Sequence, residues 1–249
     1  MTDLHPDLQG RPPAALEPPE SALAIGAHPD DAEFGAGATL SRWAAAGTRV
    51  TLLVMTDGSK GSWDPAADPA DLAQRRREEQ EAAAAAFGAA AVLQGGHVDG
   101  EFEYSMDVRA QVCRVIREVR PAVVLGHDPW RRYQLHPDHR AAGWAAVDGV
   151  VAARDHLFFP DQSLEPHRPD ALLLWSADEP NHWEDIAHTL DTKIAALLRH
   201  ATQSTNTMGS AGSDAERRAA FAARVARRAA ECGAPAGMAA AESFRRITP

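Results

Sequence analysis

Short hydrophobic runs alternate with longer amphipathic or alanine-rich segments along this chain. The hydrophobic runs predict buried strands at residues 22–27, 49–55, 91–93, 122–125 and 170–175. The segments between and after these runs predict helices at residues 35–46, 71–87, 107–119, 137–153, 185–198 and 214–231. Because strands and helices alternate, we expect an α/β fold with a mostly parallel sheet and helices on both of its faces.

The first twenty residues are predicted to behave differently from the rest. Prolines remove backbone donors that helices and sheets need, and this segment contains Pro12, Pro13, Pro18 and Pro19. We therefore predict a flexible N-terminal arm at residues 1–20 and a single domain at residues 21–249. A chain of 249 residues is long enough for one large α/β core.

Composition argues against several classes of protein. The formal net charge of -10 does not suit a nucleic-acid binder, which needs a basic face, and it supplies no polybasic membrane anchor. No hydrophobic stretch reaches the roughly 18–20 residues of a membrane span. Cys113 and Cys232 belong to no C-x-x-C motif, so we expect neither a disulfide framework nor a thiolate zinc site. We expect a cytoplasmic protein without nucleic-acid or membrane partners.

Two clusters of histidine and aspartate follow predicted strands. His-Pro-Asp-Asp occupies residues 28–31, and His-Pro-Asp-His occupies residues 136–139 after a short loop. Imidazole nitrogens and carboxylate oxygens bind zinc at about 2.0–2.2 Å. The carboxyl ends of parallel strands meet at one edge of an open α/β sheet, where such proteins keep their active sites. The clusters therefore predict one metal ion held by two histidines and one carboxylate.

The first cluster provides ligands and a base. Side chains alternate between the faces of a regular strand, but a turn stiffened by Pro29 allows neighbouring side chains to diverge. His28 and Asp31 can then bind the ion, while Asp30 faces the attacking water and serves as general base.

The second cluster opens a predicted helix. Pro137 suits the first helical position, which places His136 at the cap and His139 on the first turn. His139 is the candidate third ligand, and His136 is a candidate to stabilise an oxyanion or to protonate a leaving amine. Asp138 is expected to orient His136 and to raise the pKa of that imidazole by charge pairing.

The order of these motifs resembles that of the PIG-L/LmbE-like family of metal-dependent de-N-acetylases. The similar segments are A-H-P-D-D-A-E-F-G-A-G-A-T-L from residue 27, T-D-G from residue 56, R-R-E-E from residue 76 and H-P-D-H-R from residue 136. The resemblance implies a Rossmann-like hydrolase that removes the acetyl group from an N-acetylated amino sugar or its conjugate. It places the ligands of Zn²⁺, or of another divalent metal such as Fe²⁺, on His28, Asp31 and His139.

The resemblance also implies roles outside the ligand set. It places the general base on Asp30, the oxyanion and leaving-group histidine on His136, and a contact to substrate hydroxyl or phosphate groups on Arg76. Several family members carry a tyrosine two residues before the second cluster, where this chain has Gln134 next to Tyr133.

A late segment and three loop positions complete the candidates. D-T-K-I-A-A-L-L-R-H-A-T-Q at residues 191–203 is similar to the family's late helix and its H-x-S-Q ending, and it contains His200. Asp57 ends a predicted strand and can line the site. Trp130 and the two arginines after it can form one wall of a sugar pocket. Asp99 is interpreted as part of a simple turn.

Other functions are compatible with parts of this pattern. His28 and Asp30 with a distant histidine could form the facial triad of an Fe(II) oxygenase, although such sites usually stand on β-rich scaffolds. A non-catalytic carbohydrate-binding relative is a second alternative, and the complete set of ligands and base argues against it. The segment from Gly35 lacks the third glycine of a dinucleotide-binding fingerprint. Assembly into a homo-oligomer stays open.

Overall fold

A computed structural model describes residues 15–204 and 212–249 of the chain. Within these ranges, seven strands form a single sheet in the order β3-β2-β1-β4-β5-β7-β6. The strands are β1 (Ser21–Gly26), β2 (Arg49–Thr56), β3 (Ala91–His97), β4 (Val123–His127), β5 (Ala171–Trp175), β6 (His182–Asp185) and β7 (Ala241–Ile247). β1 to β5 are parallel, and β7 runs antiparallel to both β5 and β6. The predicted α/β fold with a mostly parallel sheet is confirmed.

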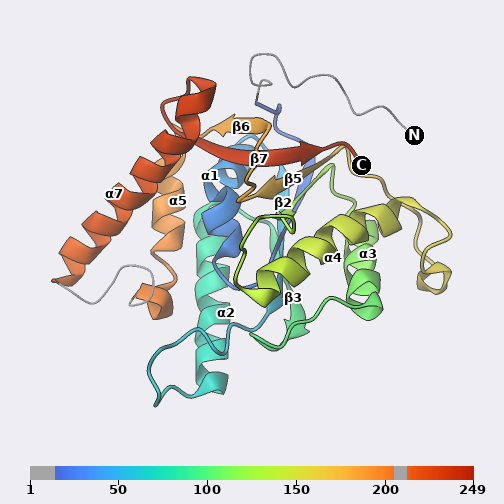
Figure 1. The fold of residues 1–249 in the computed structure, drawn as a ribbon, viewed down its shortest axis with the longest axis horizontal. Helices are drawn as coiled ribbons and strands as arrows, with labels where there is room; N and C mark the ends of the chain where they lie inside the picture. Colours follow the sequence, from blue (N-terminus) through green and yellow to red (C-terminus); the bar gives the residue numbers. More distant parts are fainter. Residues whose placement is uncertain (1–14, 205–211) are drawn as a thin grey trace.

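Helices cover both faces of the sheet, as predicted (Figure 1). They are α1 (Asp31–Ala45), α2 (Pro69–Ala86), α3 (Met106–Val119), α4 (Pro137–Arg154), α5 (Leu190–Leu197) and α7 (Asp214–Gly233). Successive residues of a strand point to opposite faces, so Leu23 and Ile25 pack with α3 and α4, whereas Ala22 and Ala24 pack with α1 and α2. Both faces of β1, β2, β4 and β5 are therefore buried, whereas β3, at the edge of the sheet, is partly exposed. Cys113 is buried in the core that contains Leu23 and Ile25.

Three elements differ from the sequence prediction: α5 is shorter than expected, and the strands β6 and β7 were not predicted. The helix predicted over residues 185–198 begins only at Leu190, because residues 182–185 form β6. β6 pairs with β7, which the sequence pattern did not reveal. Glu184 and His182 are fully buried in β6. There Glu184 accepts a hydrogen bond from His182 and forms an ion pair with Arg42. Polar residues that are buried by pairing with one another escape a search for hydrophobic alternation.

Two predicted boundaries also change. α1 begins at Asp31 rather than at residue 35, so its first turn contains part of the first His/Asp cluster. Residues 1–14 of the predicted arm lie outside the described residues. The rest of it is attached to the domain, since the Leu16 amide donates to Glu184 and the Pro19 carbonyl accepts from the Thr48 hydroxyl.

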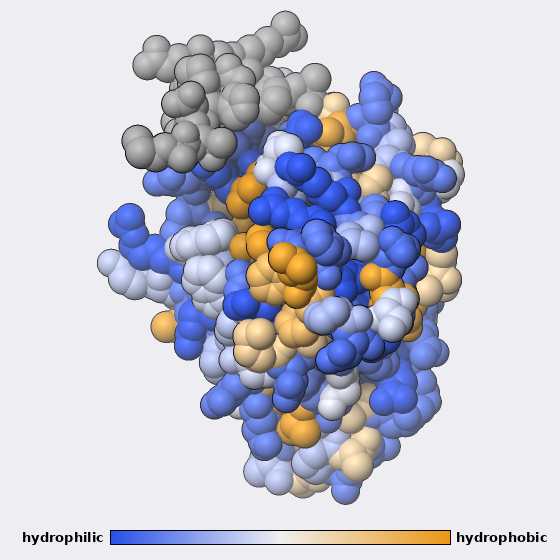
Figure 2. Space-filling view, turned by 90° about the vertical axis from the view of Figure 1, so that its right-hand side faces the viewer, coloured by the Kyte–Doolittle hydropathy of each residue, from blue (hydrophilic) through white to orange (hydrophobic). Residues whose placement is uncertain are grey.

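The surface shown in Figure 2, on the side that carries α3 and α4, is mostly hydrophilic, with a hydrophobic group near its centre. Large hydrophobic side chains that are exposed include Tyr133 and Leu135 before α4 and Leu157 after it. No helix in the described ranges combines the length and the hydrophobicity that crossing a bilayer requires. Assembly into a homo-oligomer stays a prediction.

A buried ion pair joins α1, α5 and β7. The Lys193 ammonium donates to Glu242 at 2.6 Å and to the Phe34 carbonyl at 2.8 Å. Glu242 also accepts from the amides of Ala38 and Thr39 in α1. Both charged side chains are almost fully buried. Because each neutralises the other, loss of one partner leaves an uncompensated charge inside the protein.

Replacement of Lys193 is therefore expected to destabilise the fold strongly. We expect Lys193→Met to lower the free energy of unfolding by about 3–5 kcal/mol in denaturant titrations. The double variant Lys193→Met/Glu242→Leu should recover much of this loss, because it removes the isolated carboxylate. Lys60→Met, which breaks an exposed pair with Glu101, is the control and should hardly shift the unfolding midpoint. A single variant as stable as the wild type would contradict this interpretation.

Candidate active site

The candidate site lies at the carboxyl edge of the sheet, where β1 and β4 are neighbours. β2 and β3 extend from one side of β1, and β4 and β5 extend from the other, so the strand order reverses here. All five parallel strands end at this edge. Loops that are far apart in the sequence therefore meet at a topological switch point, which is the usual place for a ligand site in open α/β sheets.

A strained turn after β1 separates two neighbouring carboxylates. Asp30 has φ 103° and ψ -20°, a conformation that residues other than glycine rarely adopt. Its amide donates to Gln80 at 2.9 Å, and its carbonyl accepts the first helical bond of α1 from Phe34. Asp30 and Asp31 can therefore serve different partners, as the sequence predicted for a turn at Pro29.

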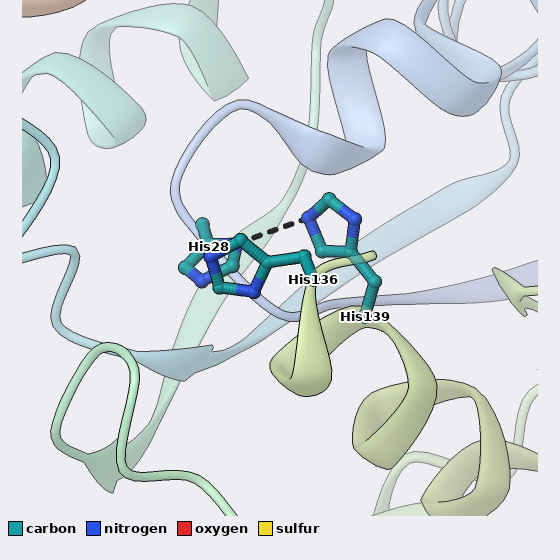
Figure 3. Close-up of side chains that lie close together, drawn as sticks. All are labelled: His28, His136 and His139. Carbon is teal, nitrogen blue, oxygen red and sulfur yellow. Dashed lines mark hydrogen bonds between the residues drawn. The ribbon is translucent and has the colours of Figure 1, made fainter. Parts of the chain in front are cut away.

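His28, Asp31 and His139 converge on one point. Nδ1 of His28 lies 3.2 Å from Nε2 of His139 and 3.5 Å from Oδ2 of Asp31. Nε2 of His139 lies 3.3 Å from Oδ1 of Asp31. Figure 3 shows the two imidazoles approaching each other from the loop after β1 and from the start of α4. Ligands about 2.0–2.1 Å from a tetrahedral ion stand roughly 3.3 Å apart. Nε2 of His139 has this spacing both from Nδ1 of His28 and from Oδ1 of Asp31, which suits a small divalent cation.

Two further carboxylates hold the opposite edge of the His28 ring. Nε2 of His28 lies 3.1 Å from Asp138 and 3.1 Å from Asp99. Asp138 is fully buried and also accepts from the Gly100 amide. The expectation that Asp138 orients His136 is therefore wrong, because this carboxylate binds His28 instead. Asp99 is buried in the site and is more than the simple turn residue expected from the sequence.

The three carboxylates around His28 favour a bound cation. Burial by itself lowers the pKa of His28, but hydrogen bonds to Asp138, Asp31 and Asp99 outweigh burial and raise the pKa to about 12. A proton thus occupies the metal-free site among three carboxylates. A carboxylate behind a histidine whose other nitrogen faces a metal is a common arrangement that fixes the ring. The donor set therefore fits a divalent ion at Nδ1 of His28.

Asp30 lies beside these groups in a separate environment. Burial raises the pKa of Asp30 to about 6, against the opposing charge of Arg76. The Arg76 guanidinium is 3.6 Å from Asp30, is itself buried, and donates to the carbonyls of Pro29 and Gly58. A Cβ at residue 58 would lie 2.7 Å from Arg76, and φ there is +68°, so glycine is required in the T-D-G motif.

His136 stands next to His28 but makes no contact with a carboxylate. The His136 and His28 rings meet edge to face, with centroids 4.5 Å apart (Figure 3). Burial, followed by the charges of His28 and His139, lowers the pKa of His136. The charge of Asp138 raises this pKa, as expected, but burial and the charges of the two neighbouring histidines outweigh it. Nδ1 of His136 is buried without a hydrogen-bond partner among the described residues.

A match to a family model identifies the group of proteins to which this site belongs. Residues 23–150, which hold both clusters and Arg76, match the PIG-L model, described as GlcNAc-PI de-N-acetylase. The chain belongs to the PIG-L family. The family resemblance of the motif order is thereby confirmed.

Individual PIG-L relatives agree with this assignment. The chain is 34% identical over 187 residues to diacetylchitobiose deacetylase from Thermococcus kodakarensis. The aligned region covers 74% of this chain and 70% of that protein. It is 34% identical over 165 residues to 1D-myo-inositol 2-acetamido-2-deoxy-α-D-glucopyranoside deacetylase from Streptomyces scabiei, and spans half of that protein. The structure of N,N'-diacetylchitobiose deacetylase from Pyrococcus horikoshii aligns with a TM-score of 0.83 at 28% identity, over 92% of this chain and 84% of that one.

The remaining predicted positions occupy the rim of this PIG-L site. Asp57 accepts the amides of Ser59 and Asp99 and so ties the loops after β2 and β3 together. Trp130 is about half exposed and packs edge to face on Trp144. Tyr133 is 86% exposed, so it does not reach the ligands from this loop conformation.

Sequence reasoning missed two histidine environments. His127 ends β4 and contacts Asp31, but it belongs to no motif and falls just beyond the predicted strand. His200 is buried 3.8 Å from Glu33, a buried carboxylate that also accepts from Gln80. The H-P-D-D motif continues into α1, so the position of Glu33 one turn along was a usable signal. The contact between Glu33 and His200 joins distant segments, so no local sequence signal could have revealed it.

A cleft of about 560 Å³ opens from the candidate ligands. Asp31, His127 and His139 line one end of it. The cleft continues past Trp175 to α7 and β7, where Arg224 and Arg228 line it. Arg131 and Gln134 also line this cleft, whereas Trp130 is not among its lining residues.

Metal binding is expected to depend on the three converging side chains. Zn²⁺ should bind with one ion per chain, and at about 100 times its Kd it should stabilise the protein by about 2.7 kcal/mol, because it binds only the folded state. His139→Ala should lose this stabilisation, measured by thermal unfolding and by chelator competition. His156→Ala, which removes an exposed histidine, is the matched control. Equal zinc binding by wild type and His139→Ala would rule out this ligand set.

Proposed function

We propose that this protein is a metal-dependent N-deacetylase, with Zn²⁺ as its ion, that acts on an N-acetylated amino sugar or its conjugate. The observation that carries the proposal is the convergence of His28, Asp31 and His139 within 3.5 Å of one another, with Asp30 beside them. The names of two groups of PIG-L relatives, which deacetylate diacetylchitobiose and a glucosaminyl inositol, support the substrate class.

His28, Asp31 and His139 would hold the ion, which when bound supplies a Lewis acid that acidifies water and polarises an acetamide carbonyl. Asp30 takes the proton from the attacking water. Its pKa near 6 suits this task, because the carboxylate is ionised at neutral pH yet is a stronger base than an exposed aspartate. The same carboxylic acid then returns a proton to the departing nitrogen, which leaves as a free amine with acetate.

His136 and Arg76 complete the proposed machinery. The unpartnered ring nitrogen of His136 can donate to the oxygen that gains negative charge in the transition state. Arg76 is buried against the carbonyls of Pro29 and Gly58, so we assign it a positioning role toward Asp30 in place of the direct substrate contact implied by resemblance. For Asp57 and Trp130 we propose the substrate contacts that the sequence led us to expect.

The cleft defines the orientation that we propose for the substrate. With the acetamide at Asp31 and His139, the rest of the molecule lies toward Trp175 and α7. A volume of about 560 Å³ falls within the usual range for small-molecule sites. An assay of amine release should use N-acetylglucosamine, N,N'-diacetylchitobiose and the N-acetylglucosaminyl inositol as substrates. Release from none of them would contradict the proposed substrate class, and release that requires oxygen would favour the oxygenase.

Substitution of Asp30 tests the base. We expect Asp30→Asn to lower kcat by about 10²–10⁴-fold, because proton transfer by a positioned group contributes about that factor. Zinc affinity should change little, since Asp30 is not among the converging ligands. Amine release and zinc competition measured on the same preparation separate the two effects. An Asp30→Asn variant that turns over at the wild-type rate would exclude Asp30 as the base.

The pH dependence of kcat/KM provides a separate test. Asp30 must be ionised to accept a proton, so activity should fall as the pH decreases through its pKa, at or below about 6 because the bound cation favours the ionised form. Arg76→Gln removes the opposing charge 3.6 Å away and should move this limb to higher pH by about one unit. Arg75→Gln, on the exposed side of α2, should leave the limb in place. An unshifted limb in Arg76→Gln would contradict the proposed coupling.

A further inference from the structure

His127 and Trp175 form a buried pair behind Asp31 that the proposed mechanism does not use. They are register partners at the ends of the parallel strands β4 and β5. The Trp175 indole N–H donates to Nδ1 of His127 at 3.0 Å, and Nε2 of His127 lies 3.1 Å from Oδ2 of Asp31. His127 is 4% exposed and Trp175 is 2% exposed, so little of either side chain is open to water although both line the cleft.

The chemistry of the pair determines where the proton of His127 lies. An indole nitrogen can only donate, so Nδ1 of His127 must accept and carries no proton. In a neutral imidazole the proton is then on Nε2, which donates to Asp31. Nε2 has no free lone pair in this state. His127 is therefore a donor to Asp31 and not a metal ligand, although it lies within reach of Asp31 and His139.

The position of the Trp175 indole depends on a glycine of α1. A Cβ placed at Gly35 would lie 2.4 Å from Cδ2 of Trp175, closer than side-chain atoms approach. The glycine in the D-A-E-F-G segment thus allows the indole to lie against α1 with its N–H directed at His127. Three elements, α1, β4 and β5, combine to set one imidazole tautomer.

We infer that Trp175 and His127 are positioning residues that select the oxygen with which Asp31 faces the metal. Oδ2 of Asp31 already accepts from the His28 amide at 2.7 Å and from His127 at 3.1 Å. Oδ1 lies 3.3 Å from His139 and stays available. Two donors on one oxygen direct the other toward the cation, so Asp31 binds through a single oxygen. This inference rests on the proposed metal site but not on the substrate.

The test combines a spectroscopic and a thermodynamic readout. Long-range ¹H–¹⁵N spectra of the metal-free wild type should show His127 protonated at Nε2 and unprotonated at Nδ1, with its signals assigned by their loss in His127→Gln. Trp175→Phe keeps a ring but removes the donor, so Nδ1-protonated His127 should appear. Zinc affinity should fall by about 10–100-fold in Trp175→Phe and His127→Leu. His127→Gln keeps an N–H near Asp31 and should retain more affinity than His127→Leu.

Trp43→Phe is the matched control. Trp43, near the end of α1, is also fully buried, but its indole nitrogen has no hydrogen-bond partner among the described residues. It should lose packing without losing zinc affinity. Wild-type His127 protonated at Nδ1, or equal zinc affinities in Trp175→Phe and Trp43→Phe, would overturn the inference. Both readouts are independent of turnover, so a protein that hydrolyses no acetamide but follows this pattern would refute only the proposed function.

Discussion

Three buried carboxylates meet at His28, and the need to neutralise them organises the candidate site. Asp99 and Asp138 hold one edge of the imidazole, while Asp31 faces the other. Carboxylates are seldom buried without a cation, because desolvation of an unpaired charge is costly. In the metal-free protein a proton on His28 partly meets this need. The divalent ion that we propose, held with His139, would meet it more completely.

The loops that carry these charges are held by groups that do not face a substrate. Arg76 joins the turn after β1 to the loop after β2 through two backbone carbonyls. Gln80 supports the strained Asp30 amide and also donates to Glu33. Helix α2 therefore stabilises a backbone conformation that costs free energy locally. The result is that Asp30 and Asp31, adjacent in sequence, have different partners and opposite pKa shifts.

The local pattern of hydrophobic and polar residues was sufficient to predict much of the fold. β1, β2, β4 and β5 are short hydrophobic runs with both faces buried, and β3 begins with such a run at the edge of the sheet. α2, α3 and α4 lie within a few residues of their predicted bounds. β6 and β7 were missed because their pairing joins residues about sixty positions apart and buries Glu184, Glu242 and His182 through contacts with one another and with α1 and α5. The start of α1 was misplaced because glycines near its middle looked like a beginning. One of these glycines, Gly35, is required because the indole of Trp175 lies against it.

The sequence by itself determined the α/β class, the two His/Asp clusters and the family, because periodicity and short motifs are local properties. It also indicated that His28, Asp31 and His139 could share an ion, since parallel strands end at one edge. Only the tertiary structure decided that Asp138 serves His28, that Arg76 is buried behind Asp30, and that His127 donates to Asp31. Each of these is a hydrogen bond between side chains from different elements. Its partner is set by the register and packing of the sheet, which no short stretch of residues encodes.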